Sequence, residues 1–238
     1  EAWGWLADIY QDEYKFAFNT RPEADDPLAR AIAASQKAIK ADATSQKGYE
    51  TLASGHYFSG DMEQFRTAAE RALSLNPNNS DTLAWLGFLI AYAGAWDRGI
   101  ALLDKAVNLN PNHPTWYHTA YALRHFRDGN YEAALLSAKR YNIPDFYWHH
   151  LTLAIIYPQL GRLDEARAAV GELTALYPGY ADVARADLEK WFKDEALVAA
   201  MLAGLEKAGL FDEPEVTRPA IAVLPFANLS GDASQAYF

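Results

Sequence analysis

The sequence contains no cysteine, which excludes disulfide bonds and thiolate metal sites. Positive charge is also scarce, because 21 lysines and arginines stand against 31 aspartates and glutamates, for a formal net charge of −10. An acidic chain is repelled by the phosphates of nucleic acids and by anionic membrane surfaces. We therefore expect neutral, apolar or basic partners and no nucleic-acid partner.

Apolar runs long enough to cross a bilayer are missing too. The apolar, uncharged stretch at residues 82–96 is shorter than the about 20 residues that a spanning helix needs. The chain does not open with a basic segment followed by an apolar one, so we expect no direct membrane contact. A cysteine-free chain suits the cytoplasm and the periplasm alike, and of the two we favour the cytoplasm.

What the sequence does have is a repeat. Half of its 238 side chains are apolar, enough for a sizeable core. Four glycines with spacings of 34, 35 and 32 residues each lie between two stretches of helical periodicity, at Gly60, Gly94, Gly129 and Gly161. A glycine in this position predicts the turn of a helical hairpin. The second helix of three hairpins is expected to end at a proline, at Pro77, Pro111 and Pro178.

A pair of residues eight positions before each glycine joins a large side chain to a small one: Leu52-Ala53, Leu86-Gly87, Tyr121-Ala122 and Leu153-Ala154. Such a pair is typical of a place where two helices approach closely. Together with the glycine turns and closing prolines, this pattern resembles the tetratricopeptide repeat. The resemblance implies an all-α fold, a right-handed superhelix of about five helical hairpins with capping helices.

The two ends of this array are less regular. The first hairpin is visible in Trp3, Leu6 and Tyr10, but its second helix, expected over residues 27–41, follows an extended loop around residues 19–26. Residues 180–209 predict a capping helix or helix pair that is interrupted near residues 193–194. Its polar side chains would protect the open end of the solenoid from water. We therefore expect the array and its cap to span residues 1–210.

The chain changes character after the array. We interpret residues 211–220 as a linker and residues 221–238 as a strand-like tail. The tail resembles the start of the TolB-like segment of bacterial class III adenylate cyclases and winged-helix regulators that also carry tetratricopeptide arrays, although there the segment usually precedes the array. Four apolar side chains are expected to dock the tail onto another surface, namely Ile221, Val223, Leu224 and Phe226.

Signatures of catalysis are absent from the sequence. No nucleophile motif and no glycine-rich phosphate loop occurs. His56, His118, His125 and His150 fall on repeat positions that normally pack between helices, and no carboxylate follows them at metal-ligand spacing. We therefore expect no catalytic residue, no metal and no cofactor, and any effector domain of the parent protein would lie outside this chain.

Aromatic residues indicate where a partner would bind. In tetratricopeptide arrays the first helix of each hairpin lines a concave groove, and the matching positions here are mostly aromatic or apolar. The predicted groove consists of Tyr57, Phe58, Phe88, Tyr92, Trp116, Leu123, Phe126, Arg127, Trp148 and Ile155, with Thr119 on the same face. Loops or neighbouring helices that cover these side chains are the alternative, because aromatic residues at helical spacing are usually core.

Two functions fit these observations. The first is a non-catalytic scaffold, the interaction module of a bacterial signalling or regulatory protein, with a protein or peptide partner in the groove. The second is the ligand-sensing part of a cyclase or regulator, with a small-molecule site in the groove. An open, elongated groove would favour the first, and a closed pocket with convergent polar groups the second. Exchange of the tail between two molecules would produce a domain-swapped homodimer.

Overall fold

The computed structural model describes residues 2–16 and 26–212. These residues form twelve α-helices and two short 3₁₀ helices, and no strand occurs among them. The α-helices are α1 (Ala2–Phe16), α2 (Pro27–Ala41), α3 (Gln46–Ser59), α4 (Met62–Leu75), α5 (Ser80–Tyr92), α6 (Trp96–Leu109), α7 (His118–Arg127), α8 (Tyr131–Tyr141), α9 (Tyr147–Ile156), α10 (Leu163–Leu176), α11 (Tyr180–Trp191) and α12 (Glu195–Lys207). The 3₁₀ helices are η1 (Thr115–Tyr117) and η2 (Tyr157–Leu160).

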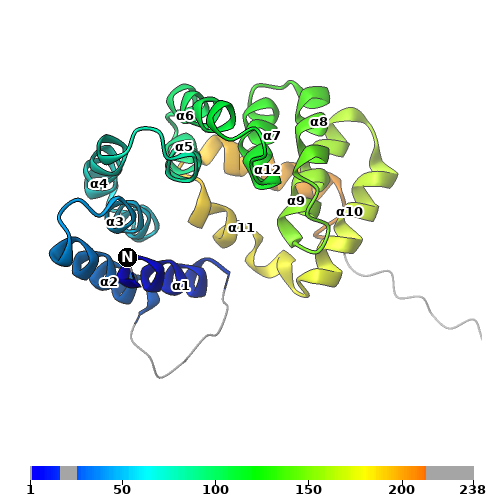
Figure 1. Cartoon of the computed structure of the whole chain (residues 1–238). Coiled ribbons are helices and arrows are strands. Elements are labelled where there is room, and N and C mark those ends of the chain that lie inside the picture. Colours follow the sequence, from blue (N-terminus) through cyan, green and yellow to red (C-terminus); the bar gives the residue numbers. More distant parts are fainter. Residues whose placement is uncertain (1, 17–25, 213–238) are drawn as a thin grey trace, which may run out of the picture.

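The first ten α-helices pair into five hairpins, which stack in sequence order into an arch (Figure 1). The helices α3, α5 and α9 lie on the inner side of the arch, and their hairpin partners α4, α6 and α10 lie on the outer side (Figure 1). The fold is an all-α tetratricopeptide-repeat solenoid, which confirms the fold class predicted from the sequence.

Local sequence explains where the helices begin and turn. The carboxylate of Asp26 accepts a hydrogen bond of 3.1 Å from the backbone N–H of Leu28, and Pro27 fits the first helical position because its missing N–H would have no partner there. Gly94 ends the first helix of the third hairpin with a φ of 97°, a conformation that only glycine adopts without strain. All four predicted turn glycines have positive φ, so the hairpin register is confirmed.

The closest helix packing occurs inside the third hairpin, between α5 and α6. A Cβ atom on Gly87 would lie 2.8 Å from the carbonyl oxygen of Gly99, and one on Gly99 would lie 2.6 Å from the Cβ of Ala91. Real Cβ atoms do not approach other atoms this closely, so only glycine fits at these two positions. The small residue in the predicted large-small pair therefore serves the close approach of the two helices.

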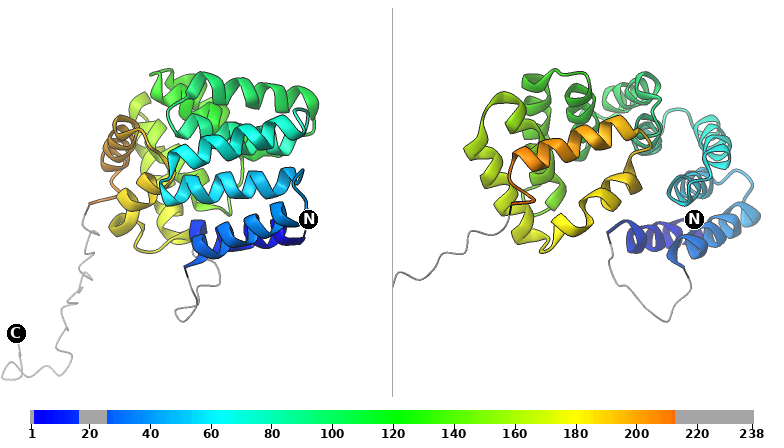
Figure 2. Two further views of the ribbon diagram at one scale, coloured as in Figure 1. Left: turned by 90° about the vertical axis from the view of Figure 1, so that its left-hand side faces the viewer. Right: turned by 180° about the vertical axis from the view of Figure 1, so that it is seen from behind.

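The last two helices form the predicted pair, but they do not cap the open end of the solenoid. They cross the concave side of the arch instead, α11 in the middle of Figure 1 and α12 across the inner helices as seen from behind (Figure 2). The phenol of Tyr57 in α3 donates to the carbonyl oxygen of Trp191, and a Cβ on Gly204 would lie 3.0 Å from the Cα of Ile155 in α9. The aromatic inner surface favours this placement, because it offers apolar area against which the two helices are buried.

The two ends of the array meet through α11. The ammonium of Lys190 donates a hydrogen bond of 2.7 Å to the backbone carbonyl of Lys15 in α1, although 175 residues separate the two in sequence. The same ammonium pairs with Asp187 at 2.8 Å. The buried carboxylate of Asp187 also accepts hydrogen bonds from the phenols of Tyr147 and Tyr180, at 3.0 and 3.1 Å. These contacts fix α11 between α1 and α9.

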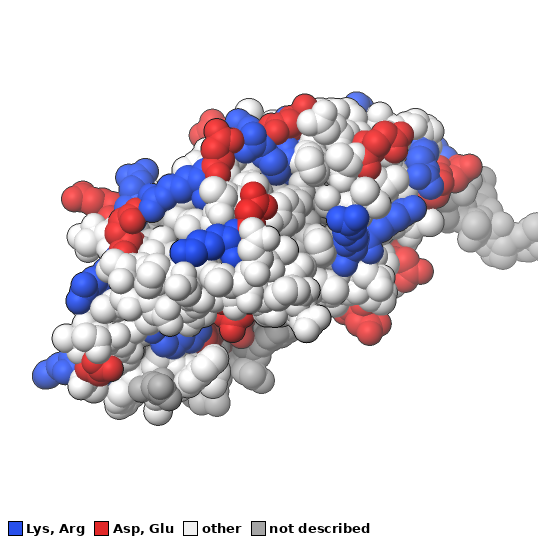
Figure 3. Space-filling view, turned by 45° about the horizontal axis from the view of Figure 1, so that its top comes forward, with Lys and Arg blue, Asp and Glu red and all other residues white. Residues whose placement is uncertain are grey.

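Charged side chains of both signs alternate over the upper face of the arch, without a field of one sign (Figure 3). Ion pairs link neighbouring hairpins, such as Arg124 with Asp97 at 2.7 Å and Arg98 with Glu70. Within residues 2–16 and 26–212, no helix combines the length and the apolarity that crossing a bilayer requires.

Some predicted segments lie outside the described residues. They are most of the loop expected at residues 19–26, nearly all of the linker at 211–220, and the tail with its docking side chains. The docking surface and the exchange of tails between two molecules therefore stay predictions. The predicted groove near Phe88 and Tyr92 is contacted in this structure by Trp191 and Phe192.

Candidate functional site

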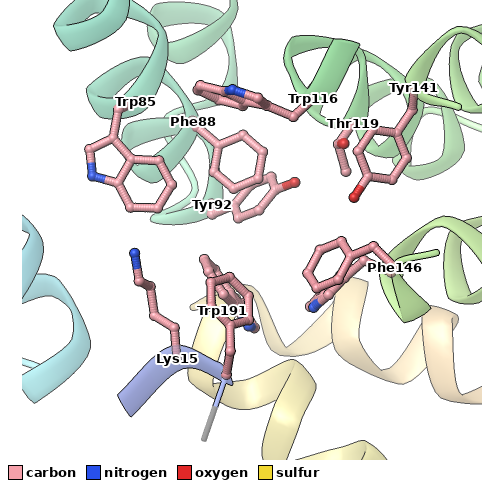
Figure 4. Close-up of a pocket in the computed structure, with 11 residues that line it drawn as sticks. Lys15, Trp85, Phe88, Tyr92, Trp116, Thr119, Tyr141, Phe146 and Trp191 are labelled. Carbon is pink, nitrogen blue, oxygen red and sulfur yellow. The ribbon is translucent and has the colours of Figure 1, made fainter. Parts of the chain in front are cut away.

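A cavity of about 240 Å³ remains on the concave side, between the inner helices of the arch and α11 (Figure 4). Almost all of its lining side chains are aromatic. The lining residues are Lys15, Phe16, Trp85, Phe88, Tyr92, Trp116, Thr119, Tyr141, Phe146, Trp148 and Trp191. Because these residues come from α1, α5, η1, α7, α8, α9 and α11 and from the loop before α9, the site exists only in the assembled solenoid.

One wall is built by α5. Trp85, Phe88 and Tyr92 are three and four residues apart, which places them on one face of the helix. Trp85 stacks on Phe88 with ring centroids 5.9 Å apart, and Phe88 lies 4.1 Å from Tyr92. Trp116 of η1 packs edge to face on both Trp85 and Phe88, at 6.3 and 5.9 Å. Such contacts hold the rings in defined orientations.

The opposite wall belongs to α9, α11 and the end of α1. Trp148 and Trp191 pack edge to face at 5.8 Å, and Phe16 contacts both Trp191 and Phe146, at 5.8 and 5.5 Å. Trp148 and Trp191 are buried, whereas Phe16 and Phe146 are half-buried. Together with the half-buried Trp85 and Trp116, the last two form the accessible rim of the cavity.

Few polar groups of the described residues reach this cavity, and each of them can donate a hydrogen bond. The hydroxyl of Tyr92 is buried, has no hydrogen-bond partner within the described part of the chain and points into the cavity (Figure 4). Burial raises the pKa of Tyr92 well above its ordinary value, so the phenol stays protonated. The indole N–H of Trp191 is likewise buried without an acceptor among the described residues. The hydroxyl of Tyr141 also points into the cavity (Figure 4), and burial raises its pKa while a hydrogen bond with Thr119 lowers it.

Among the described residues that line the cavity, one carries a charge, Lys15. Its ammonium pairs with Asp12 at 2.7 Å and lies 4.7 Å from the ring centroid of Trp85, a cation–π distance. No aspartate or glutamate is among the described residues that line the cavity. The positive charge is therefore balanced from outside the cavity, and the interior stays close to neutral.

The structure brings four of the ten predicted groove residues into this cavity: Phe88, Tyr92, Trp116 and Trp148. Thr119, which we expected on the same face, lines it as well. Tyr57 and Phe58 contact Trp191 instead, the second with ring centroids 5.0 Å apart.

The remaining predicted groove residues lie towards α12. Ile155 is fully buried against Gly204, and Arg127 pairs with Asp194 at 3.6 Å. Phe126 borders a second hollow that α12 helps to line, and Leu123 is fully buried in the core. The predicted face is thus the concave face, but α11 and α12 cover most of it.

Sequence reasoning missed six lining residues: Lys15, Phe16, Trp85, Tyr141, Phe146 and Trp191. Trp191 had a detectable signal, since the adjacent Trp191 and Phe192 are unusual in a segment that we interpreted as polar and solvent-facing. The repeat positions that predicted Phe88 and Tyr92 on the same helix do not include Trp85. No repeat position points to Lys15, Phe16 or Phe146, because they lie at helix ends or in loops.

Within the described parts of the chain, no group of three histidines or carboxylates lies close enough to hold a metal ion. Four histidines, His56, His118, His125 and His150, are half-buried between helices. His149 is buried, with its Nδ1 atom unpartnered among the described residues. Desolvation lowers the pKa of His149 below its ordinary value, and the neighbouring His150 lowers it further.

The sequence matches no protein-family model and no curated protein. Solved structures share the fold. TTC0263, a tetratricopeptide-repeat protein of Thermus thermophilus, has a TM-score of 0.59 at 18% identity, over 86% of this chain and 99% of that chain. PilW, a type IV pilus biogenesis factor, has a TM-score of 0.60 at 17% identity, over 87% of this chain and 89% of that chain.

A third similar structure is the Cut9–Hcn1 hetero-tetramer of the APC/C, with a TM-score of 0.62 at 14% identity. That match covers 90% of this chain and 40% of that chain. At these identities the likeness establishes the tetratricopeptide-repeat fold alone. A role for this chain has to be argued from its own residues.

Proposed function

We propose that this chain is a non-catalytic interaction module that binds a protein or peptide partner at the concave side of its arch. The observation that carries the proposal is the rim of the aromatic cavity, where four half-buried aromatic side chains from separate parts of the chain meet: Phe16, Trp85, Trp116 and Phe146. Aromatic side chains grouped around a concave opening are the usual anchors of protein interfaces.

The C-terminal helices restrict where the partner binds. Because α11 and α12 bury Tyr57, Phe58 and Ile155, a partner would contact the rim and not the whole length of the inner surface. Chemistry at the rim suits a neutral or basic segment with apolar side chains, since the chain as a whole is acidic. PilW is described as a type IV pilus biogenesis factor, and Cut9 occurs in a hetero-tetramer with Hcn1.

The parent protein that we propose is a bacterial signalling or regulatory protein with its effector domain outside this chain. The support is the resemblance of residues 218–238 to the start of the TolB-like segment of cyclases and winged-helix regulators. The absence of nucleophile and phosphate-loop motifs agrees with an accessory role for the chain.

Selection of a peptide display library on the full chain tests the proposal. We expect recovered peptides to lose binding at least tenfold on the variant Trp116→Ala, because this substitution removes one rim anchor. The matched control is Trp5→Ala, which removes a 60% exposed tryptophan of α1 outside the rim and should keep binding. Peptides that bind the wild type and Trp116→Ala equally well would contradict the proposed surface.

A further inference from the structure

We propose that the interior of the aromatic cavity is a binding site for a small, neutral aromatic molecule that carries a hydrogen-bond acceptor oxygen. The inference goes beyond the interaction function and does not rest on it, because it concerns the buried groups behind the rim. It follows from three properties of the cavity: its unpaired donors, its charge and its size.

The unpaired donors define the polar part of the ligand. Tyr92 directs a buried hydroxyl into the cavity, and Trp191 contributes a buried N–H, both without an acceptor in the described residues. Buried polar groups in proteins are nearly always hydrogen-bonded, because leaving one unpaired costs the desolvation of that group. Since Tyr92 stays protonated, its hydroxyl is available to donate to an oxygen atom of a ligand. A carbonyl oxygen meets this requirement.

The charge of the cavity excludes ionic ligands. An aromatic cage would suit an organic cation, but the ammonium of Lys15 already lies over the ring of Trp85, and no carboxylate is among the lining residues that the structure describes. An anion would also be disfavoured, because Asp12 already neutralises Lys15 and a second buried charge would lose its hydration. A neutral ligand remains.

The size and the walls of the cavity define the apolar part. Its volume of about 240 Å³ exceeds the ~150 Å³ of an engineered protein cavity that binds benzene. There is room for one substituted ring or two fused rings. The walls offer flat rings at several orientations, among them Phe88, Trp148 and Trp191, and aromatic rings pack well edge to face at such surfaces. The half-buried rim side chains leave a path for entry.

Acetophenone and α-methylstyrene test this assignment, because they have nearly the same shape and differ in the acceptor oxygen. Each is titrated into the full chain and followed by protein NMR chemical shifts. We expect saturable binding of acetophenone, and affinity about fivefold to tenfold weaker for α-methylstyrene, the loss of roughly one hydrogen bond. Equal affinities, or no saturable shift with either compound, would overturn the proposal.

The variant Tyr92→Phe locates the donor. It removes only a hydroxyl without a partner among the described residues, so the fold should be kept, which the melting temperature checks. We expect Tyr92→Phe to bind acetophenone as weakly as the wild type binds α-methylstyrene, and to bind α-methylstyrene unchanged. The matched control is Tyr49→Phe, which changes a tyrosine that does not line the cavity and should leave both affinities unaltered. Wild-type affinity of Tyr92→Phe for acetophenone would show that the assigned donor is wrong.

The test also separates this inference from the proposed function. Trp116→Ala should weaken peptide binding at the rim as well as both small molecules, whereas Tyr92→Phe should weaken acetophenone alone. If Tyr92→Phe weakens acetophenone binding and leaves peptide binding intact, the result supports the interior site independently of the proposed function. Peptides that depend on Trp116, together with a wild type that does not bind acetophenone, would keep the interaction function and refute this inference.

Discussion

The backbone N–H of Lys193 donates a hydrogen bond of 3.0 Å to the carbonyl oxygen of Tyr92. This carbonyl belongs to the last turn of α5, where helical carbonyls lack a partner within their own helix. The backbone at the break between α11 and α12 therefore supplies a hydrogen-bond donor for the end of α5, the helix that builds one wall of the cavity. Backbone as well as side-chain contacts hold α11 against the concave surface. The cavity exists because α11 lies there and forms part of its wall.

Trp191→Ala tests how much α11 contributes to stability. Trp191 is 5% exposed and contacts the rings of Phe16, Phe58, Phe88 and Trp148. Loss of such a buried ring should cost about 3–5 kcal/mol of unfolding free energy, measured by urea denaturation. The 60% exposed Trp5 is the control, and Trp5→Ala should cost less than about 1 kcal/mol. Similar losses in both variants would mean that α11 does not pack in the groove.

Gly99→Ala tests the close approach of α5 and α6. The added Cβ would meet the Cβ and backbone nitrogen of Ala91 at 2.6 Å, and we expect destabilisation by about 1–3 kcal/mol from overpacking. In Gly171→Ala, on α10, the new Cβ meets no atom within 4 Å. That control should stabilise the protein by about 0.5–1 kcal/mol, because alanine favours a helix interior. Thermal melts of the two variants should therefore shift in opposite directions.

Leu86→Ala tests the repeat register. Leu86 is fully buried in α5, and the cavity left behind should cost about 2–5 kcal/mol. Leu153 holds the matching position in the fifth hairpin, but its side chain is half-buried, so Leu153→Ala should cost less. Chemical denaturation of both variants measures the two losses of unfolding free energy. A larger loss for Leu153→Ala than for Leu86→Ala would contradict this packing.

The depressed pKa of buried His149 predicts a loss of stability in mild acid. In the unfolded chain a histidine titrates near ~6.5. As the pH falls below this value, the unfolded state binds a proton that folded His149 resists, so stability present above about pH 6.5 is progressively lost. We expect the decrease in melting temperature between pH 8 and pH 5.5 to be smaller in His149→Gln than in the wild type.

The baseline for that experiment is the melting temperature of each protein at pH 8, where His149 is neutral in the folded and in the unfolded state. His56 and His118 contribute in the same direction, since burial lowers the pKa of each as well, so His149→Gln should retain part of the effect. An unchanged slope in His149→Gln would rule out His149 as the main source.

The hairpins were predictable from the sequence because their determinants are local. Glycines with positive φ, such as Gly94, and close-packed pairs, such as Leu86-Gly87, recur with the repeat period and act on neighbouring residues. The same locality explains why the break at residues 193–194 could be read correctly.

The cavity was only partly predictable, because its geometry depends on a contact that no period encodes. Whether residues 180–207 stack on α10 or cross the inner face is decided by the total apolar area buried, to which Trp191 and Phe192 contribute at long range. Lys15 and Phe146 line the cavity because α11 crosses the inner face. The residues next to them in sequence therefore do not indicate that they belong to a site. Tyr57, Phe58 and Ile155, which were predicted to face a partner, consequently pack against the C-terminal helices of the chain itself.

The hydrogen bond between Lys190 and Lys15 has a consequence for how the chain folds. Repeat arrays with contacts between neighbours alone can nucleate anywhere and lose single repeats from their ends. Here the first helix is joined to the eleventh across 175 residues, so part of the native contacts form only after a very long loop has closed. Relative contact order rises, which slows the last folding step, and fraying of the first hairpin is coupled to release of the last helices. We therefore expect the five local units to unfold together.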